Sequence, residues 1–216
     1  MRTRIVPIFA LPLLLSACHR IAQIGAYPLH RNITATRFWV GEKPQKGAQN
    51  GVSAWDEHWQ EHFGGIDDPA HRGGLLPAGF RPRQNPFYVA LPYNDLSTDG
   101  RKPDAARIIP WANQQPAPGK WQSLCKDHWV RISRNGRTCY AQWEDVGPFE
   151  TDDAAYVFGP ANASPRNHQN QNAGIDVSPA VSAYLHIGGM AKVDWQFVTP
   201  SDVPTGLWTH IITGDN

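Results

Sequence analysis

Apolar and polar residues alternate along several short segments of the chain, and this two-residue period predicts β-strands. The clearest strand ends at Gly147-Pro148, because proline has no N–H to continue a ladder. Side chains alternate along a strand, so we expect Ala141, Trp143 and Asp145 to share one face. Further strands are predicted at 34–40, 85–95, 129–133 and 193–198.

A period of three to four residues appears at two places and predicts short helices. In 54–63, large apolar residues recur every four positions and form one buried stripe, namely Trp55, Trp59 and Phe63. In 179–187, Ser178 is suited to cap the first turn and Pro179 to occupy the first helical position. We therefore expect a mainly β protein with short peripheral helices and long loops.

Glycine and proline are frequent, with 19 of each in 216 residues, and this composition favours β-structure with many turns. We expect one domain over 34–198, followed by a C-terminal tail at 199–216. The Asn-rich segment 159–174 is long for a connection in such a domain, which predicts a functional or mobile loop. The formal net charge of +1 offers no basic field, so we expect no nucleic-acid partner.

The first 18 residues have the pattern of a targeting segment. A basic start precedes an apolar stretch at 5–15 that is too short to span a bilayer. Leu15-Ser16-Ala17-Cys18 resembles a bacterial lipobox, in which the cysteine is lipidated and becomes the mature N-terminus. The resemblance implies a lipid anchor at Cys18, and His19 after it favours the outer membrane, facing the periplasm. An ordinary signal peptide is the alternative, and 19–33 is expected to be a tether.

Two cysteines remain beyond Cys18, and an exported pair suggests a Cys125–Cys139 disulfide. There is a geometric objection to this bond. Asn135-Gly136 predicts a hairpin tip, which would place Cys139 opposite Ile132. Because a disulfide needs Cα atoms within about 7 Å, Cys125 would have to fold back from its strand.

An aromatic ring and a carboxylate occur together at two predicted strand ends. Trp143 precedes Asp145, and Tyr93 precedes Asp95. Such a ring can stack on the apolar face of a sugar while the carboxylate takes hydroxyls or protons, so all four are candidates for substrate contact. The alternative for the first pair is a core tryptophan with an aspartate that caps a turn.

Two histidines share a face of the predicted helix 54–63, at the spacing of some zinc helices. A His-Glu-x-x-His motif needs glutamate directly after the first histidine, but Trp59 follows His58, and His62 completes the pair. A solvated helix face is the simpler interpretation. We therefore expect no metal, and the sequence indicates no other cofactor.

The segment from about 127 to 198 resembles the double-psi β-barrel domain of rare lipoprotein A. That family has a hairpin, an Asn-Asp-x-Gly-Pro-Phe block, then Ile-Asp-Leu-Ser before a helix, and a closing strand. The counterparts here are Glu144-Asp145-Val146-Gly147-Pro148-Phe149 and Ile175-Asp176-Val177-Ser178. The resemblance implies a six-stranded double-psi β-barrel, with peptidoglycan or another polysaccharide as the partner.

Expansins and family-45 glycoside hydrolases use the same barrel. Thr36-Arg37-Phe38-Trp39 is similar to the Thr-Arg-Tyr-Trp-Asp opening of the hydrolases, but Val40 stands where their aspartate follows. Glu42 could replace that carboxylate if the loop redirects it. The resemblance puts the catalytic acid of the hydrolases on Asp176 and makes Trp39 a candidate for substrate contact.

Three functions follow. In the first, Asp176 is the general acid of a lytic transglycosylase that cleaves peptidoglycan strands, where the sugar's own hydroxyl attacks. In the second, a β-glucan hydrolase uses two carboxylates, Asp176 with Asp145 or Glu42. In the third, an expansin-like protein binds glycan without cutting it. We expect Asp145 and Asp176 to share one groove, with Trp143 on its wall.

One physical argument opposes catalysis by Asp176. It lies just before a predicted helix N-terminus, whose dipole favours the ionised carboxylate, whereas a general acid at neutral pH must hold its proton. Burial or repulsion from Asp145 would have to exceed a dipole contribution of roughly 0.3–1 kcal/mol.

Overall fold

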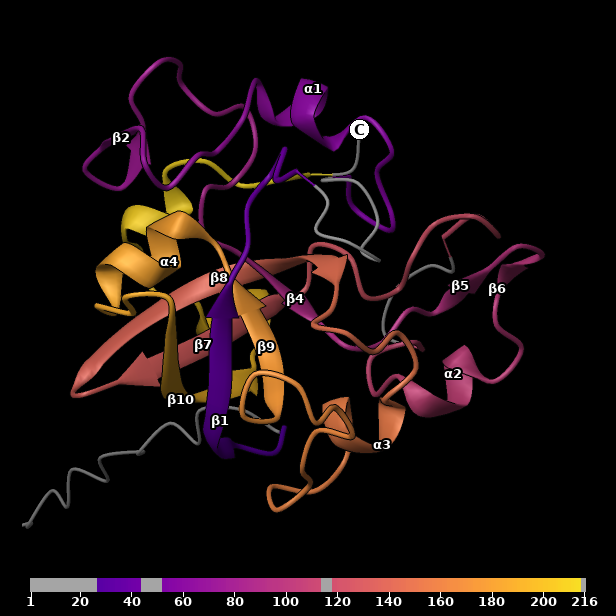
Figure 1. Cartoon of the computed structure of the whole chain (residues 1–216). Helices are drawn as coiled ribbons and strands as arrows, with labels where there is room; N and C mark the ends of the chain where they lie inside the picture. Colours follow the sequence, from indigo (N-terminus) through magenta and orange to yellow (C-terminus); the bar gives the residue numbers. More distant parts are fainter. Residues whose placement is uncertain (1–26, 44–51, 114–117, 215–216) are drawn as a thin grey trace, which may run out of the picture.

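The computed structural model describes residues 27–43, 52–113 and 118–214. Six strands close into a barrel in the order β1-β10-β7-β8-β4-β9 (Figure 1). The strands are β1 (His30–Arg37), β4 (Tyr88–Leu91), β7 (Trp129–Arg134), β8 (Arg137–Val146), β9 (Ala173–Val177) and β10 (Met190–Phe197). The β1/β9 and β4/β8 pairs are parallel and the other pairs are antiparallel. The predicted fold class, a mainly β six-stranded barrel, is confirmed.

Short elements surround the barrel (Figure 1). Two small sheets pair β2 (Arg72–Gly73) with β3 (Leu76–Pro77) and β5 (Leu96–Ser97) with β6 (Gly100–Arg101). The helices are α1 (Trp59–Phe63), α2 (Ala105–Ile108), α3 (Ala154–Val157) and α4 (Pro179–Tyr184), with 3-10 turns η1 (Pro200–Asp202) and η2 (Leu207–Thr209). None of the helices in these described ranges is long and apolar enough to cross a membrane. The predicted targeting segment and Cys18 lie outside the described residues.

The first strand begins earlier than predicted. β1 starts at His30 rather than at 34, and the His30 ring stacks on Trp195 with centroids 4.3 Å apart. Before it, the Tyr27 ring packs edge-on against Trp111 at 5.6 Å and Phe197 at 6.1 Å. The end of the predicted tether is therefore part of the folded domain, because its aromatic residues bury apolar surface there.

The predicted hairpin joins β7 to β8. Asn135 and Gly136 both have positive φ, 48° and 76°, which matches the right-handed twist of a two-residue hairpin. Arg134 pairs with Arg137 across the turn, and Cys139 lies opposite Ile132, as the turn position predicts.

A β-bulge in β8 reverses one expectation. Trp143 pairs with Val89, but Asp145 pairs with Ala90, the next residue of β4, so Glu144 is an extra residue in β8. Successive residues of β4 point to opposite sides of the sheet. The expectation that Trp143 and Asp145 share a face is therefore wrong. Trp143 points into the barrel and Asp145 points out of it.

The barrel interior is aromatic and is closed by the C-terminal segment. Trp143 and Phe197 stack inside it with centroids 5.6 Å apart. Residues 199–214 pack across the barrel, where Trp208 meets Phe87 edge-on and the Thr213 N–H donates to Gln142 Oε1 at 2.9 Å. Residues 199–214, which the sequence predicts only as a tail, thus cover part of the core.

Both predicted helices exist, and the second matches its prediction more closely. α4 has Ser178 as its N-cap, whose Oγ accepts from Val181 N–H at 3.2 Å, and Pro179 at its first position. α1 is shorter than predicted and ends at Gly64, whose φ of 106° is left-handed. Trp55 precedes α1 and is only half-buried, so the expected stripe reduces to Trp59 and Phe63.

The predicted disulfide is not formed, and Cys125 and Cys139 are both buried free thiols. The backbone N–H of Asp127, two residues after Cys125, donates to Trp143 O at 3.0 Å. Trp143 is four residues along β8 from Cys139, which at 3.3 Å per residue is about 13 Å. The loop that carries Cys125 therefore meets β8 too far from Cys139 for an S–S bond.

Candidate functional site

Two aspartates lie in one row on the outer face of the barrel. Ala90 on β4 pairs with Asp145 on β8 and with Asp176 on β9, and Asp176 pairs in turn with Thr36 on β1. Paired residues in a sheet point to the same side, so Asp145, Asp176 and Thr36 all face outward. The two aspartates sit two strand spacings apart, roughly 10 Å between Cα atoms.

The segment between β1 and β4 covers part of this outer face. Tyr88, two residues before Ala90, leaves the main core and packs in a second apolar cluster with Val40, Trp59 and Phe63. Its Oη donates to Asp67 Oδ2 at 2.9 Å. Figure 1 shows α1 and β2 on the same side of the barrel. The row of aspartates is therefore partly shielded, and each of the two remains partly exposed.

Asp176 is held by a hydroxyl and shielded from water. Thr36 Oγ1 donates to Asp176 Oδ1. Burial raises the pKa of Asp176 to about 7, although the Thr36 hydrogen bond lowers it, and the nearby Glu42 carboxylate raises it further. A carboxyl with such a pKa is protonated in a large fraction of molecules near neutral pH, which a general acid requires.

Asp145 has a similar pKa for a similar reason. Burial raises the pKa of Asp145 to about 7 against hydrogen bonds from the backbone of Ala54 and Val146, and the charge of Asp176 adds to the increase. Those two N–H groups donate to Asp145 Oδ1 at 2.8 and 2.7 Å. The carboxyl is therefore fixed in direction by backbone groups while it lies within electrostatic reach of Asp176.

Glu42 belongs to the same neighbourhood. Burial raises the pKa of Glu42, while the Trp39 backbone hydrogen bond and the Arg37 guanidinium lower it. The Glu42 charge raises the pKa of Asp176, so the two carboxyls lie within electrostatic reach of one another. All three carboxylates predicted as catalytic candidates thus lie around one outer surface of the barrel.

Burial of Asp176 outweighs the helix-dipole objection to catalysis. α4 has only six residues, and its capping hydrogen bond goes to Ser178 Oγ rather than to Asp176. Asp176 lies within β9 and points away from the barrel. The burial effect on its pKa outweighs the stabilisation of the ionised form.

Three predicted substrate contacts are internal instead. Trp143 has no exposed surface, and Tyr93 is 1% exposed, so neither ring can meet a sugar. Asp95 is also fully buried, where it accepts from Ser123 Oγ at 2.6 Å and Leu124 N–H at 2.7 Å. Asp95 therefore holds the 123–126 loop, and the similarity of Tyr93/Asp95 to Trp143/Asp145 is not functional.

Two aromatic residues near these carboxylates in the sequence keep exposed surface. Trp39 is half-buried beside Glu42, and it is the one predicted aromatic contact that keeps access to solvent. Phe149, which follows Gly147-Pro148, is 50% exposed. Thr36, the partner of Asp176, was present in the similarity to family-45 hydrolases, but nothing in the sequence connected it to Asp176.

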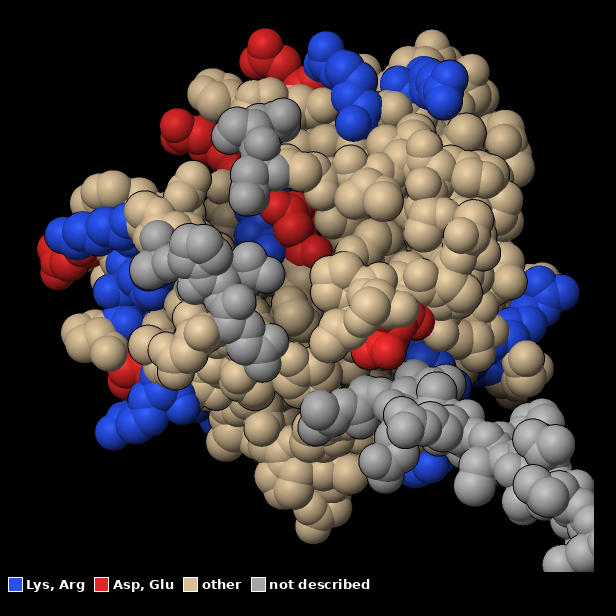
Figure 2. Space-filling model, turned by 180° about the vertical axis from the view of Figure 1, so that it is seen from behind, with Lys and Arg blue, Asp and Glu red and all other residues tan. Residues whose placement is uncertain are grey.

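Charged and metal-ligating groups elsewhere are dispersed. On the face shown in Figure 2, acidic and basic side chains are interspersed and neither sign covers a continuous area. Within the described ranges no group of three or more His, Cys, Asp or Glu residues is arranged to hold a metal ion. His62 Nδ1 instead lies 2.9 Å from Asp56.

The raised pKa values predict that the two aspartates weaken the fold at high pH. A carboxyl whose folded-state pKa is above its unfolded value favours the folded state below about pH 4, and that contribution is lost as the pH rises through about 7. We expect Asp145→Asn and Asp176→Asn to raise the free energy of unfolding by about 1–4 kcal/mol at about pH 8, with the gain vanishing near pH 4. Urea unfolding at both pH values measures this, and variants less stable than wild type at pH 8 would contradict it.

Comparisons with known proteins leave the family open. No protein-family model matches the chain, and no curated protein matches it. Among solved structures the chain is similar to "Streptomyces papain inhibitor (SPI)", with 19% identity over 82% of this chain and 98% of that chain and a TM-score of 0.34. The resemblance to rare lipoprotein A stays a prediction, and the chemistry of the site rests on this chain's own residues.

Proposed function

We propose that the protein cleaves glycan strands of peptidoglycan at the surface formed by Asp176, Asp145 and Glu42. The observation that carries the proposal is the pair of outward-facing aspartates in one row, each with its pKa raised to about 7. Strongly raised pKa values of neighbouring carboxyls concentrate at catalytic sites. Two carboxyls with pKa values of about 7 are each partly protonated at neutral pH, so either can give or accept a proton there.

The pair supplies both proton transfers of a transglycosylase. Asp176 gives its proton to the glycosidic oxygen as the C–O bond breaks. A hydroxyl of the same sugar attacks the anomeric carbon, and Asp145 accepts the proton that this hydroxyl releases. The new C–O bond forms an anhydro bridge within that sugar, and no water is consumed. At the end of the step Asp176 is ionised and Asp145 is protonated.

A glycan binder without cleavage is the second candidate. The observation that favours it is that Asp145 Oδ1 already accepts two backbone N–H groups, which gives this carboxylate a structural role. On this view the carboxylates would accept hydrogen bonds from sugar hydroxyls, and Trp39 and Phe149 would be the available apolar surfaces. Hydrolysis of a β-glucan by the same two carboxylates is a third possibility, distinguished by its products.

The proposed location is the cell envelope, with the domain tethered to the outer membrane through lipid on Cys18. The support is the lipobox-like sequence Leu15-Ser16-Ala17-Cys18. Metabolic labelling with a fatty acid tests the anchor, and label that persists in Cys18→Ala would refute it.

Digestion of purified peptidoglycan followed by mass analysis tests the function. Anhydro-sugar ends on released fragments are expected. Fragments with reducing ends would indicate a hydrolase instead. Absence of release, together with co-sedimentation of the protein with peptidoglycan, would favour the binder.

A further inference from the structure

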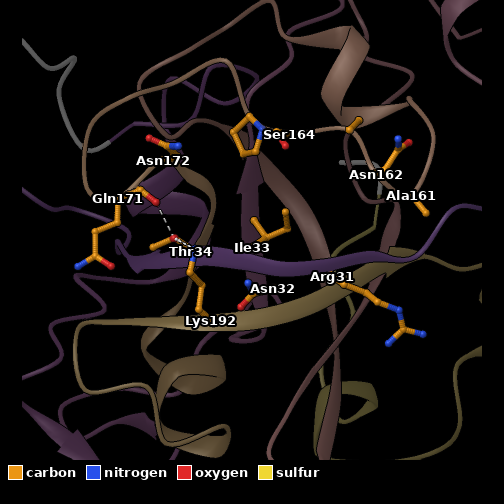
Figure 3. A pocket seen from close by; sticks show the side chains of 12 residues that line it. Arg31, Asn32, Ile33, Thr34, Ala161, Asn162, Ser164, Gln171, Asn172 and Lys192 are labelled. Atoms are coloured by element: carbon orange, nitrogen blue, oxygen red, sulfur yellow. Dashed lines mark hydrogen bonds between the residues drawn. The ribbon is translucent and has the colours of Figure 1, made fainter.

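A polar pocket of about 250 Å³ lies on the outer face of the barrel, between β1, β10 and the 159–172 loop. Figure 3 shows side chains from these three elements around it. The loop is held to the barrel at this point, because Thr34 Oγ1 donates to Gln171 O at 2.8 Å. The pocket is therefore a built feature of the loop–barrel contact.

The pocket adjoins the row of aspartates. Thr34 and Thr36 lie two residues apart on β1 and both point outward, since Ala35 between them packs in the barrel core. Thr34 lines the pocket, whereas Thr36 bonds to Asp176. Two residues of strand span about 7 Å, so a chain molecule whose bond lies at Asp176 can place a neighbouring group in the pocket.

The charged residues that line the pocket are basic. No Asp or Glu among the described residues lines it, whereas Arg31 and Lys192 both do. Arg31 is already paired with Asp194 at 3.3 Å. Lys192 Nζ donates to Thr34 Oγ1 at 2.7 Å, which holds this ammonium group of β10 against β1. An ammonium group has three N–H donors, so further donors remain for an anion.

The rest of the lining suits a hydroxylated ligand. The loop residues Asn162, Ser164, Gln171 and Asn172 are among those that line the pocket, and their side chains carry amides or a hydroxyl (Figure 3). Amides and hydroxyls both donate and accept hydrogen bonds, as sugar hydroxyls and acetamido groups require. Gln171 and Asn172 have positive φ, 57° and 56°, a conformation that is costly outside glycine and occurs preferentially at functional sites.

We propose that this pocket binds a carboxylate-bearing sugar residue of the glycan strand, next to the bond that lies at Asp176, with Lys192 as the partner of the carboxylate. The inference rests on the proposed function for its substrate class. It adds that the site distinguishes glycans carrying acidic groups from neutral ones. Ammonium–carboxylate hydrogen bonds are among the stronger polar contacts in proteins, so the charge on the ligand should matter.

The test compares two forms of one ligand. Soluble glycan fragments of peptidoglycan, freed of their peptides so that the carboxylates on the sugars are not amide-linked, are used as they are and after conversion of these carboxylates to methyl esters. Binding is measured by calorimetry in an Asp176→Asn background, so that no ligand is cleaved. Lys192→Gln removes the charge and keeps a donor, and Lys120→Gln is the matched control, because Lys120 packs on Trp121 in another loop.

We expect Lys192→Gln to raise the Kd for the carboxylated fragments roughly five- to tenfold and to leave the Kd for the esters unchanged. Lys120→Gln should change neither. An unchanged Kd for carboxylated fragments, an equal loss for the esters, or no binding of fragments at all would overturn the inference. Cleavage by the wild-type protein is scored separately, so a protein that binds in this way without cutting refutes only the proposed activity.

Discussion

Asp176→Asn is expected to lower the release of glycan fragments by about 10²- to 10⁴-fold, the usual contribution of a general acid. Asparagine has nearly the same size and its Oδ1 can still accept from Thr36, so the surface keeps its shape. The variant cannot give a proton to the leaving oxygen. Binding of peptidoglycan should stay close to wild type, and fragment release with co-sedimentation measures both properties.

The pH dependence of fragment release tests the same prediction independently. Because the pKa of Asp176 is raised to about 7, release should fall as the pH rises above about 7 and the acid loses its proton. Asp99→Asn serves as the control, since Asp99 is an exposed residue in the β5–β6 turn. Release by Asp176→Asn equal to that of Asp99→Asn would mean that Asp176 is not the acid.

Trp143→Ala is expected to cost about 3–5 kcal/mol of unfolding free energy, as for other large aromatic residues removed from a core. The ring is fully buried, stacks on Phe197 and donates from Nε1 to Asp145 O at 2.7 Å. Its removal leaves a cavity and also frees the backbone next to the β8 bulge. Urea unfolding measures the change.

Trp121→Ala is the matched control, because Trp121 is 62% exposed and its loss should change stability by less than about 0.5 kcal/mol. The comparison also separates two roles for Trp143. If Trp143→Ala kept wild-type stability and lost glycan binding, the ring would be a sugar contact after all, and its burial in the barrel would be wrong.

Features with a local cause could be predicted from the sequence. Asn135-Gly136 specifies a hairpin because both residues tolerate positive φ, and the structure has both angles there. Ser178-Pro179 specifies a helix start because the hydroxyl replaces a missing backbone partner. These signals depend on a few adjacent residues, so no knowledge of the remaining fold was needed.

The direction of Asp145 could not be predicted in this way. Alternation along β8 assigns it to the side of Trp143, and the bulge at Glu144 moves it to the other side. The bulge depends on how β8 pairs with β4, which is a property of two strands rather than of one. The pairing through Ala90 puts Asp145 and Asp176 on one outer face of the barrel, whereas Trp143 lies inside it, so the expected place of Trp143 on a groove wall is wrong.

Burial separated residues that look alike in the sequence. Asp95 and Asp145 each follow an aromatic residue at a strand end, yet Asp95 holds a loop through Ser123 while Asp145 lies on the same outer face of the barrel as Asp176. The adjacent residues in the sequence are similar in both cases. The surroundings that decide the outcome come from residues 38–43, 52–83 and 118–126, whose paths follow from tertiary packing.

The position of β10 in the barrel has a consequence for the order of events during synthesis. β10 pairs with β1 on one side and with β7 on the other, so the first strand of the barrel cannot complete its pairing until the last strand has been synthesised. A chain that emerges from its N-terminus cannot seal the cylinder until nearly all of it is available, and pairings so distant in sequence form slowly. Such a nascent polypeptide therefore stays open for most of its elongation and becomes compact only when its last strand has been made.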